Sequence, residues 1–253
     1  MTGAPSHLPL PESIDAAEFE DPDELTPTRF SMERGLLVIG QRTELILVRH
    51  AQQLRTLKEA LRPGGPGLSD FGRAQAGLTG EYLAADQSGT TPITAVYCSD
   101  LNRTAETAEI IAAAVTPSAA PISDPQLREV DMYSRDRGGA DVSADIQEEA
   151  GEEFARTLRW DAFPNTESSR EFRLRIYRAL ERIADKHTNE RVLVVSHAGA
   201  ISSFFAHLTG AEPDMFYFAG HASVNRVYHG DDRFVTGSLN EVGHLRNRAA
   251  LTF

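Results

Sequence analysis

The sequence has a single cysteine, Cys98, and no run of apolar residues that approaches the length of a membrane helix. One cysteine excludes an intramolecular disulfide and is typical of a reducing compartment, so we expect a cytoplasmic protein. About 20 consecutive apolar residues are needed to span a bilayer, so no membrane segment is expected. The opening residues also lack the basic start and the apolar middle of a secretory signal.

Basic residues are scarce relative to acidic ones. The chain has 25 Lys and Arg against 37 Asp and Glu, a net charge of −12. Nucleic acids and acidic membranes bind positive surfaces, so neither is expected as a partner. A small anionic substrate is compatible with this charge if a local group of arginines lines its pocket. The length of 253 residues and the 41% of hydrophobic residues are those of an ordinary globular protein with a buried core.

The first part of the chain differs in composition from the rest. Residues 1–28 contain no Lys or Arg, several prolines and a series of acidic side chains. Such a composition is typical of segments that do not bury a core of their own. We therefore predict an acidic, partly disordered N-terminal extension over residues 1–40; a lid or a partner-binding arm is the alternative. One domain over residues 41–253 follows, with an inserted helical cap region at about 130–170.

The remaining sequence alternates strand-like and helix-like segments. Continuous apolar runs of strand length are typical of strands buried on both faces of a sheet, and strands of this kind are expected at residues 44–50, 93–100 and 191–197. Helical spacing of apolar residues predicts helices over 68–86, 101–115 and 167–187, with Ser69 as a candidate N-cap, and a further helix that follows His197 and ends at Gly210. An acidic surface helix is expected near 141–153, and two final antiparallel strands around Gly230 and Asp231. This order predicts a three-layer α/β/α sandwich with a mostly parallel central sheet.

Reactive side chains follow the three apolar strands. The first strand ends in Arg49 and His50, the second is followed by Arg103, and the third ends in His197. Ligands bind at the carboxyl ends of parallel strands, so two imidazoles and two guanidinium groups are expected in one crevice. Arg103 falls in the first turn of a predicted helix, where the helix dipole disfavours a cation unless an anion lies nearby. A phosphate held by the guanidinium and by backbone N–H groups fits this position.

Five motifs in a fixed order carry a family resemblance. They are "LVRHAQ", "LSDFGRAQA", "CSDLNRTAETA", "LREVD" and "VVSHAGAI". With them, residues 44–240 resemble the histidine phosphatase superfamily, whose fold is that of the phosphoglycerate mutases. The resemblance implies the three-layer fold predicted above and a phosphoryl group carried on a histidine.

The resemblance also implies roles for individual residues. It makes His50 the nucleophile, with Arg49, Arg103 and His197 binding the phosphate oxygens and the backbone N–H of Ala198 adding a contact; His50 and His197 are the catalytic histidines. The physics of the transfer agrees, because an attacking imidazole must be neutral and nearby cations disfavour its protonated form. Arginines can also supply the charge stabilisation that Mg²⁺ provides in other enzymes, so no metal and no cofactor are expected.

Glu129 in "LREVD" is the third catalytic residue implied, as the proton donor to the leaving oxygen. Asp131, two residues further on, is the alternative. The family often follows this glutamate with a tryptophan-containing sequence, whereas this chain continues with "DMYSRDRGG". The local sequence therefore leaves both carboxyl groups as candidates.

The region after His50 separates hydrolysis from mutase chemistry. The mutase branch has an asparagine and an arginine there to hold the substrate; this chain has Thr56 in place of the asparagine. Arg55, Lys58 and Arg62 could contact an anionic substrate, although solvated side chains explain them better; Arg62 is kept as the candidate substrate-binding residue. We therefore favour a metal-independent phosphatase acting on a small phosphorylated metabolite, with a mutase-type phosphotransferase or an inactive phosphate-binding scaffold as alternatives. A homodimer is a further expectation, and the substrate stays open.

Three further positions attract interest. His221 and Ser223 lie in "GHASVNRV", near the place where the family's late loop approaches the pocket, so either could touch the substrate. Trp160 could cover the mouth of the site or belong to the core of the helical region. The sequence does not decide between these two places for Trp160.

Overall fold

The computed structural model describes residues 42–87, 91–133 and 142–253. All of them belong to one compact unit, Gly40–Phe253. The predicted extension over residues 1–40 lies outside the described residues, and the predicted cap region lies partly outside them. Among the described residues, no helix has the length and apolar content needed to cross a membrane.

A six-stranded mixed sheet forms the centre of the fold, with strand order β3-β2-β4-β1-β5-β6. The strands are β1 (Thr43–Arg49), β2 (Ile93–Cys98), β3 (Ile122–Ser123), β4 (Arg191–Ser196), β5 (Val224–Gly230) and β6 (Arg233–Glu241). The four strands from β3 to β1 run parallel to one another. Strand β5 is antiparallel to β1, and β6 is antiparallel to β5. The prediction of a mostly parallel sheet ending in an antiparallel pair is confirmed.

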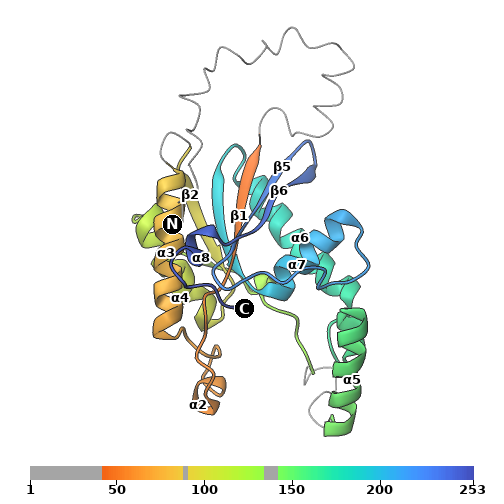
Figure 1. The fold of residues 1–253 in the computed structure, drawn as a ribbon. Helices are drawn as coiled ribbons and strands as arrows, with labels where there is room; N and C mark the ends of the chain where they lie inside the picture. Colours follow the sequence, from red (N-terminus) through yellow and green to blue (C-terminus); the bar gives the residue numbers. More distant parts are fainter. Residues whose placement is uncertain (1–41, 88–90, 134–141) are drawn as a thin grey trace, which may run out of the picture. The chain divides into compact units, whose positions relative to one another are not determined.

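Helices cover both faces of this sheet (Figure 1). Helices α3 (Asp70–Asp86) and α4 (Asn102–Val115) pack on one face, and α6 (Ser169–Lys186) and α7 (Ala198–Thr209) pack on the other. The shorter helices are α2 (Leu57–Ala60), α5 (Ala144–Thr157) and α8 (Gly243–Arg246). Figure 1 shows α2 and α5 beyond the carboxyl ends of the parallel strands. The three-layer sandwich predicted from the sequence is thus the observed fold.

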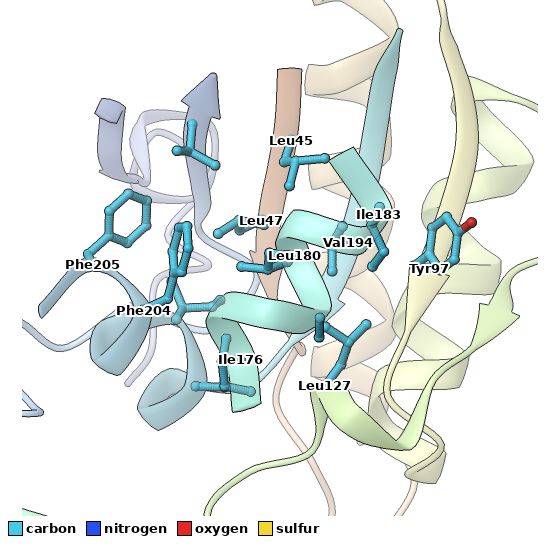
Figure 2. Close-up of a cluster of buried hydrophobic side chains, with 14 of the residues drawn as sticks. Leu45, Leu47, Tyr97, Leu127, Ile176, Leu180, Ile183, Val194, Phe204 and Phe205 are labelled. Carbon is cyan, nitrogen blue, oxygen red and sulfur yellow. The ribbon is translucent and has the colours of Figure 1, made fainter. Parts of the chain in front are cut away.

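Strand β1 contributes to the cores on both faces because successive side chains point in opposite directions. Leu45 and Leu47 belong to the cluster under α6 and α7, and Ile46 and Val48 to the cluster under α3 and α4; all four are at most 1% exposed. Figure 2 shows the first cluster, in which side chains of α6 lie over β1 and β4. Burying one such aliphatic side chain contributes about 1.5–3 kcal/mol, so the central strands that carry the site are firmly held.

Short local signals set the helix ends. The Ser69 hydroxyl accepts a hydrogen bond from the Gly72 N–H at 3.0 Å and caps α3. Gly210 ends α7 in the left-handed conformation, with φ 69°, which glycine adopts without steric cost. At the other end of α7, strand β4 passes into the helix through His197 alone. The side chain at this junction therefore lies between a strand end and a helix N-terminus.

Candidate active site

His50 and His197 meet at the carboxyl edge of the sheet. Arg49 pairs with Ser196 in the β1–β4 register, so the residues that follow them are neighbours. The His50 N–H donates to the Ser196 carbonyl oxygen at 2.9 Å. The two imidazole rings are 5.2 Å apart between centroids and inclined by 62°. Both side chains are buried, which places two titratable rings in one enclosed site.

One ring nitrogen of His50 is bound to a backbone carbonyl group, which leaves the other nitrogen for a ligand. Its Nδ1 lies 2.8 Å from the Ala51 carbonyl oxygen, which can only accept, so Nδ1 carries the proton. The lone pair is therefore on Nε2. Burial, and then the charges of His197, Arg103 and Arg49, hold the pKa of His50 well below its ordinary value. The ring is neutral at neutral pH, as a nucleophilic imidazole must be.

A chain of hydrogen bonds orients His197. Arg103 Nη2 donates to Nδ1 at 3.2 Å. Because arginine can only donate, the proton of neutral His197 is on Nε2, which lies 2.9 Å from the Ser99 hydroxyl. That hydroxyl is 2.7 Å from the Thr104 hydroxyl, which donates onward to a backbone carbonyl. Burial and the neighbouring arginines lower the pKa of His197 as well.

Two arginines bring positive charge to the histidines. Burial lowers the pKa of Arg49 to about 10, and it also lowers the pKa of Arg103, so both guanidinium groups stay charged at neutral pH. The buried Nε atoms of both arginines have no hydrogen-bond partner among the residues that the structure describes. A buried N–H donor without a partner is costly. The two donors are therefore suited to an anionic ligand.

Glu129 lies against the first turn of α7. Its Oε2 accepts from the Gly199 N–H at 2.9 Å, and its Oε1 accepts from the Val130 N–H at 3.1 Å. Burial raises the pKa of Glu129 despite these bonds and despite the attraction of Arg103 and Arg49. A Cβ atom on Gly199 would lie 2.3 Å from Glu129 Oε1. Glycine at this position is what allows the carboxyl group to approach the helix.

Asp131, the alternative proton donor, is exposed, whereas Glu129 is partly buried. The charges of Arg49 and Arg103 both act on Glu129. Asp131 acts instead on Arg128, outside the pair of histidines. Asp131 lines the same pocket as Arg103, but Glu129 is the carboxyl group on which the charges of both Arg49 and Arg103 act.

A pocket of about 530 Å³ adjoins the site, and Arg103 and Glu129 lie on its wall. Two more arginines line this pocket, but each is already paired. Arg128 binds Asp100 through Nε at 2.5 Å and through Nη2, and Arg175 binds Glu167 through two bonds of 2.7 Å. The positive charge on this wall is therefore largely balanced within the protein.

The other candidate residues fall in different places. Ala198 is the first residue of α7, where backbone N–H groups have no partner within the helix. The Arg62 side chain is 52% exposed and pairs with Glu59 at 3.5 Å; no contact joins it to the histidines in the described structure, and its substrate-binding role stays a prediction. Trp160 belongs to the core, where its Nε1 donates to Ser203 at 3.0 Å.

His221, which the sequence suggested as a possible substrate contact, lies at the site against Arg49 and His50. Its Nε2 is 3.0 Å from Arg49 Nη2, and its ring is 5.7 Å from that of His50. Ser223 is buried in the same loop, and its hydroxyl has no partner within the described part of the chain. The contact of His221 with Arg49 depends on the tertiary fold, and only its position in "GHASVNRV" suggested proximity. In the described ranges, no group of three or more His, Cys, Asp or Glu side chains is placed to hold a metal.

The carboxyl edge of this α/β sheet carries two histidines and two arginines, an arrangement suited to binding a phosphate group. Comparison with known proteins gives the family. The model of the histidine phosphatase superfamily (branch 1) matches residues 45–242, and the chain belongs to that family. Its family membership and relatives support an enzyme of the phosphatase or mutase type.

Two relatives from Arabidopsis thaliana are similar over most of their length. One, named metal-independent phosphoserine phosphatase, is 32% identical over 224 residues, 85% of this chain and 89% of the relative. The other, named phosphoglycerate mutase-like protein 4, is 33% identical over 212 residues, 82% and 89% of the two chains. Among solved structures, YhfR of Bacillus stearothermophilus has a TM-score of 0.66 at 22% identity, covering 80% of this chain and 99% of its own. That similarity shows the shared fold.

Proposed function

We propose that this protein is a metal-independent phosphatase that hydrolyses a small phosphomonoester through a phosphohistidine on His50. The observation that carries the proposal is the buried pair His50 and His197, with ring centroids 5.2 Å apart. Two guanidinium groups accompany the pair, and their Nε donors have no hydrogen-bond partner among the described residues. Such a site suits a phosphoryl group, whose charge must be spread over its equatorial oxygens during transfer.

In the first step, His50 Nε2 attacks phosphorus and the bond to the leaving oxygen breaks. Arg49 and Arg103 bind the phosphate oxygens, with the Ala198 N–H at the start of α7 as a further donor. His197 adds a bond to the phosphate when its Nδ1 carries a proton and Arg103 turns from that nitrogen to the phosphate. Glu129 gives its proton to the leaving alkoxide, and its raised pKa supports this role. General acid catalysis of this kind contributes about 10²- to 10⁴-fold.

In the second step, Glu129 acts as a base. It takes a proton from water, the water oxygen attacks phosphorus, and the bond to His50 breaks. The products are inorganic phosphate and the free imidazole. Splitting the displacement into two steps in this way is the general advantage of covalent catalysis.

Hydrolysis is favoured over mutase chemistry by the charges around the pocket. A mutase substrate brings a carboxylate and a second phosphate, which require further cations. Arg128 and Arg175 are already paired with acidic side chains, and Arg62 pairs with Glu59 at the surface. Phosphoserine is the first substrate to test, because the relative named as its phosphatase covers 85% of this chain.

The test is a screen of phosphorylated metabolites, including phosphoserine and 3-phosphoglycerate, with the wild type and His50→Ala. We expect phosphate release that EDTA does not change and that His50→Ala abolishes. Interconversion of 3-phosphoglycerate and 2-phosphoglycerate without net phosphate release would instead identify a mutase. Phosphate release by His50→Ala at the wild-type rate contradicts the mechanism, and no turnover of any ester by the wild type favours a binding module.

A further inference from the structure

A single loop, residues 218–223, surrounds the Arg49 guanidinium. The Phe218 ring lies 4.9 Å from the guanidinium carbon, the Ala219 carbonyl oxygen accepts from Nη1 at 2.6 Å, and His221 Nε2 lies 3.0 Å from Nη2. Two of the three guanidinium nitrogens are thus bound to this loop, and Nε is left without a partner in the described structure. The loop therefore sets the direction in which Nε–H points.

The hydrogen bond to Arg49 requires one tautomer of His221. Arginine only donates, so His221 Nε2 must accept and the ring proton must be on Nδ1. Nδ1 lies 3.0 Å from the Thr252 hydroxyl oxygen, which can accept that proton. Gln75 Nε2 donates to the same oxygen at 2.8 Å. Thr252 is therefore held in place and fixes the tautomer of His221.

Further contacts join the loop to the chain on both sides. The His221 N–H donates to the Thr252 carbonyl oxygen at 3.0 Å, and the Ala222 N–H donates to the Arg49 carbonyl oxygen at 3.1 Å. Ala222 has φ 56°, in the left-handed region that residues with a Cβ rarely adopt. A conformation of this kind persists where surrounding contacts determine it. The loop is thus fixed between strand β1 and the segment of residues 250–253.

The surroundings also keep His221 neutral. Burial, and then the charges of Arg49 and Arg55, lower its pKa to about 3. A protonated ring would place an N–H donor against the Arg49 donor and lose the bond. At the pH of an ordinary assay, His221 Nε2 therefore stays unprotonated and accepts the hydrogen bond from Arg49.

We propose that His221, fixed by Thr252, is a positioning residue that orients Arg49 for binding the phosphoryl group. It acts through Arg49, at a distance from the bonds that form and break. The proposal rests on the proposed function only for the statement that Arg49 binds phosphate. The proposal also gives residues 250–253 a role, because Thr252 in this segment binds His221 and holds the loop in place.

The test compares His221→Leu, which removes the acceptor, with His221→Gln, whose amide oxygen can take its place. Binding of inorganic phosphate and orthovanadate is measured by calorimetry, and KM and kcat are measured on a substrate that the wild type turns over. We expect His221→Leu to weaken phosphate binding about tenfold, the effect of losing one hydrogen bond to a charged group. We expect His221→Gln to recover most of this loss, which a purely structural role of the ring would not allow.

Thr252→Val is the milder variant, and it carries the test if His221→Leu does not fold. It should weaken phosphate binding in the same direction, and it should have no further effect in an Arg49→Ala background. His229→Leu is the matched control, because His229 is a buried histidine at the far end of the sheet, paired in register with Thr43. It should leave phosphate binding unchanged.

Two outcomes overturn the proposal: His221→Leu and Thr252→Val bind phosphate as the wild type does, or they weaken binding equally in the Arg49→Ala background. The calorimetry separates this result from the proposed function. A wild type that binds phosphate but turns over no ester defeats the phosphatase, while weaker binding by the variants still supports the role of His221.

Discussion

Gly199→Ala tests the assignment of Glu129 with the smallest change that the chain allows. A Cβ at residue 199 would lie 2.3 Å from Glu129 Oε1 and 2.7 Å from Trp160 Cζ2. Trp160 is held in the core by its bond to Ser203, so the carboxyl group is the part that can yield. To reach ordinary contact, at 3.4 Å or more, Glu129 Oε1 must retreat by about 1 Å. That retreat moves the proposed proton donor and leaves the nucleophile in place.

The size of the effect follows from the geometry. A displacement of about 1 Å in a catalytic group can cost about 10²-fold in rate, and overpacking of the core costs about 1–3 kcal/mol of stability. We expect the rate of the burst phase, which reports transfer of the phosphoryl group to His50, to fall about 10²-fold on an alkyl phosphate. On 4-nitrophenyl phosphate the fall in the burst rate should be much smaller, because that leaving group departs without a proton. Burst kinetics on both esters, with thermal unfolding measured in parallel, give the comparison.

Gly77→Ala is the control for this experiment. Gly77 lies in helix α3, and a Cβ there would meet no atom within 4 Å. Alanine should leave both activities unchanged and raise helix stability by up to about 1 kcal/mol. If Gly199→Ala lowers the burst rates on the two esters by the same factor, the damage is not specific to proton donation, and the role of Glu129 as proton donor is wrong.

Two further predictions concern the carboxyl groups and the histidines. Glu129→Gln should abolish turnover of alkyl phosphates while Asp131→Asn retains it; the reverse result, in steady-state assays, makes Asp131 the donor. The lowered pKa values of His50, His197 and His221 mean that the unfolded chain binds more protons below pH 6.5 than the folded one. The free energy of unfolding should therefore fall as the pH drops below about 6.5, by up to about 1.4 kcal/mol per pH unit for each histidine. The raised pKa of Glu129 has the opposite effect on stability, but it is a single group, whereas three histidines destabilise the folded chain. A melting temperature that is constant from pH 7.5 to 5 would contradict it.

Much of the fold could be predicted because it depends on local patterns. The apolar run of β1 and the helical spacing in α6 are each complete within a few turns of chain, and Ser69 and Gly210 mark helix ends through local geometry. Strand β3 has no such pattern. Ile122 and Ser123 are both exposed, and they form a strand only because β2 offers a parallel edge beside them.

The site, like the fold, has parts that the sequence predicts and parts that only the structure shows. The sequence places His50 and His197 at strand ends, and the parallel register then brings them together. The bond from Arg49 to His221 joins residues 172 positions apart in sequence, and the bond from His221 to Thr252 joins two loop positions. No periodicity relates such residues. The sequence could suggest that this loop approaches the pocket, but only the folded chain shows which atom of His221 faces Arg49.

The opposite charges of the surface and the site together favour a small substrate. The chain carries a net charge of −12, yet Arg49 and Arg103 remain charged inside the site. Exposed charges are screened over about 8 Å at physiological salt, whereas buried charges are screened much less. A compact phosphomonoester can therefore reach the arginines without meeting the full repulsion of the surface. A polyanion lies along many exposed acidic groups at once, so the same surface disfavours it even though its phosphates match the site.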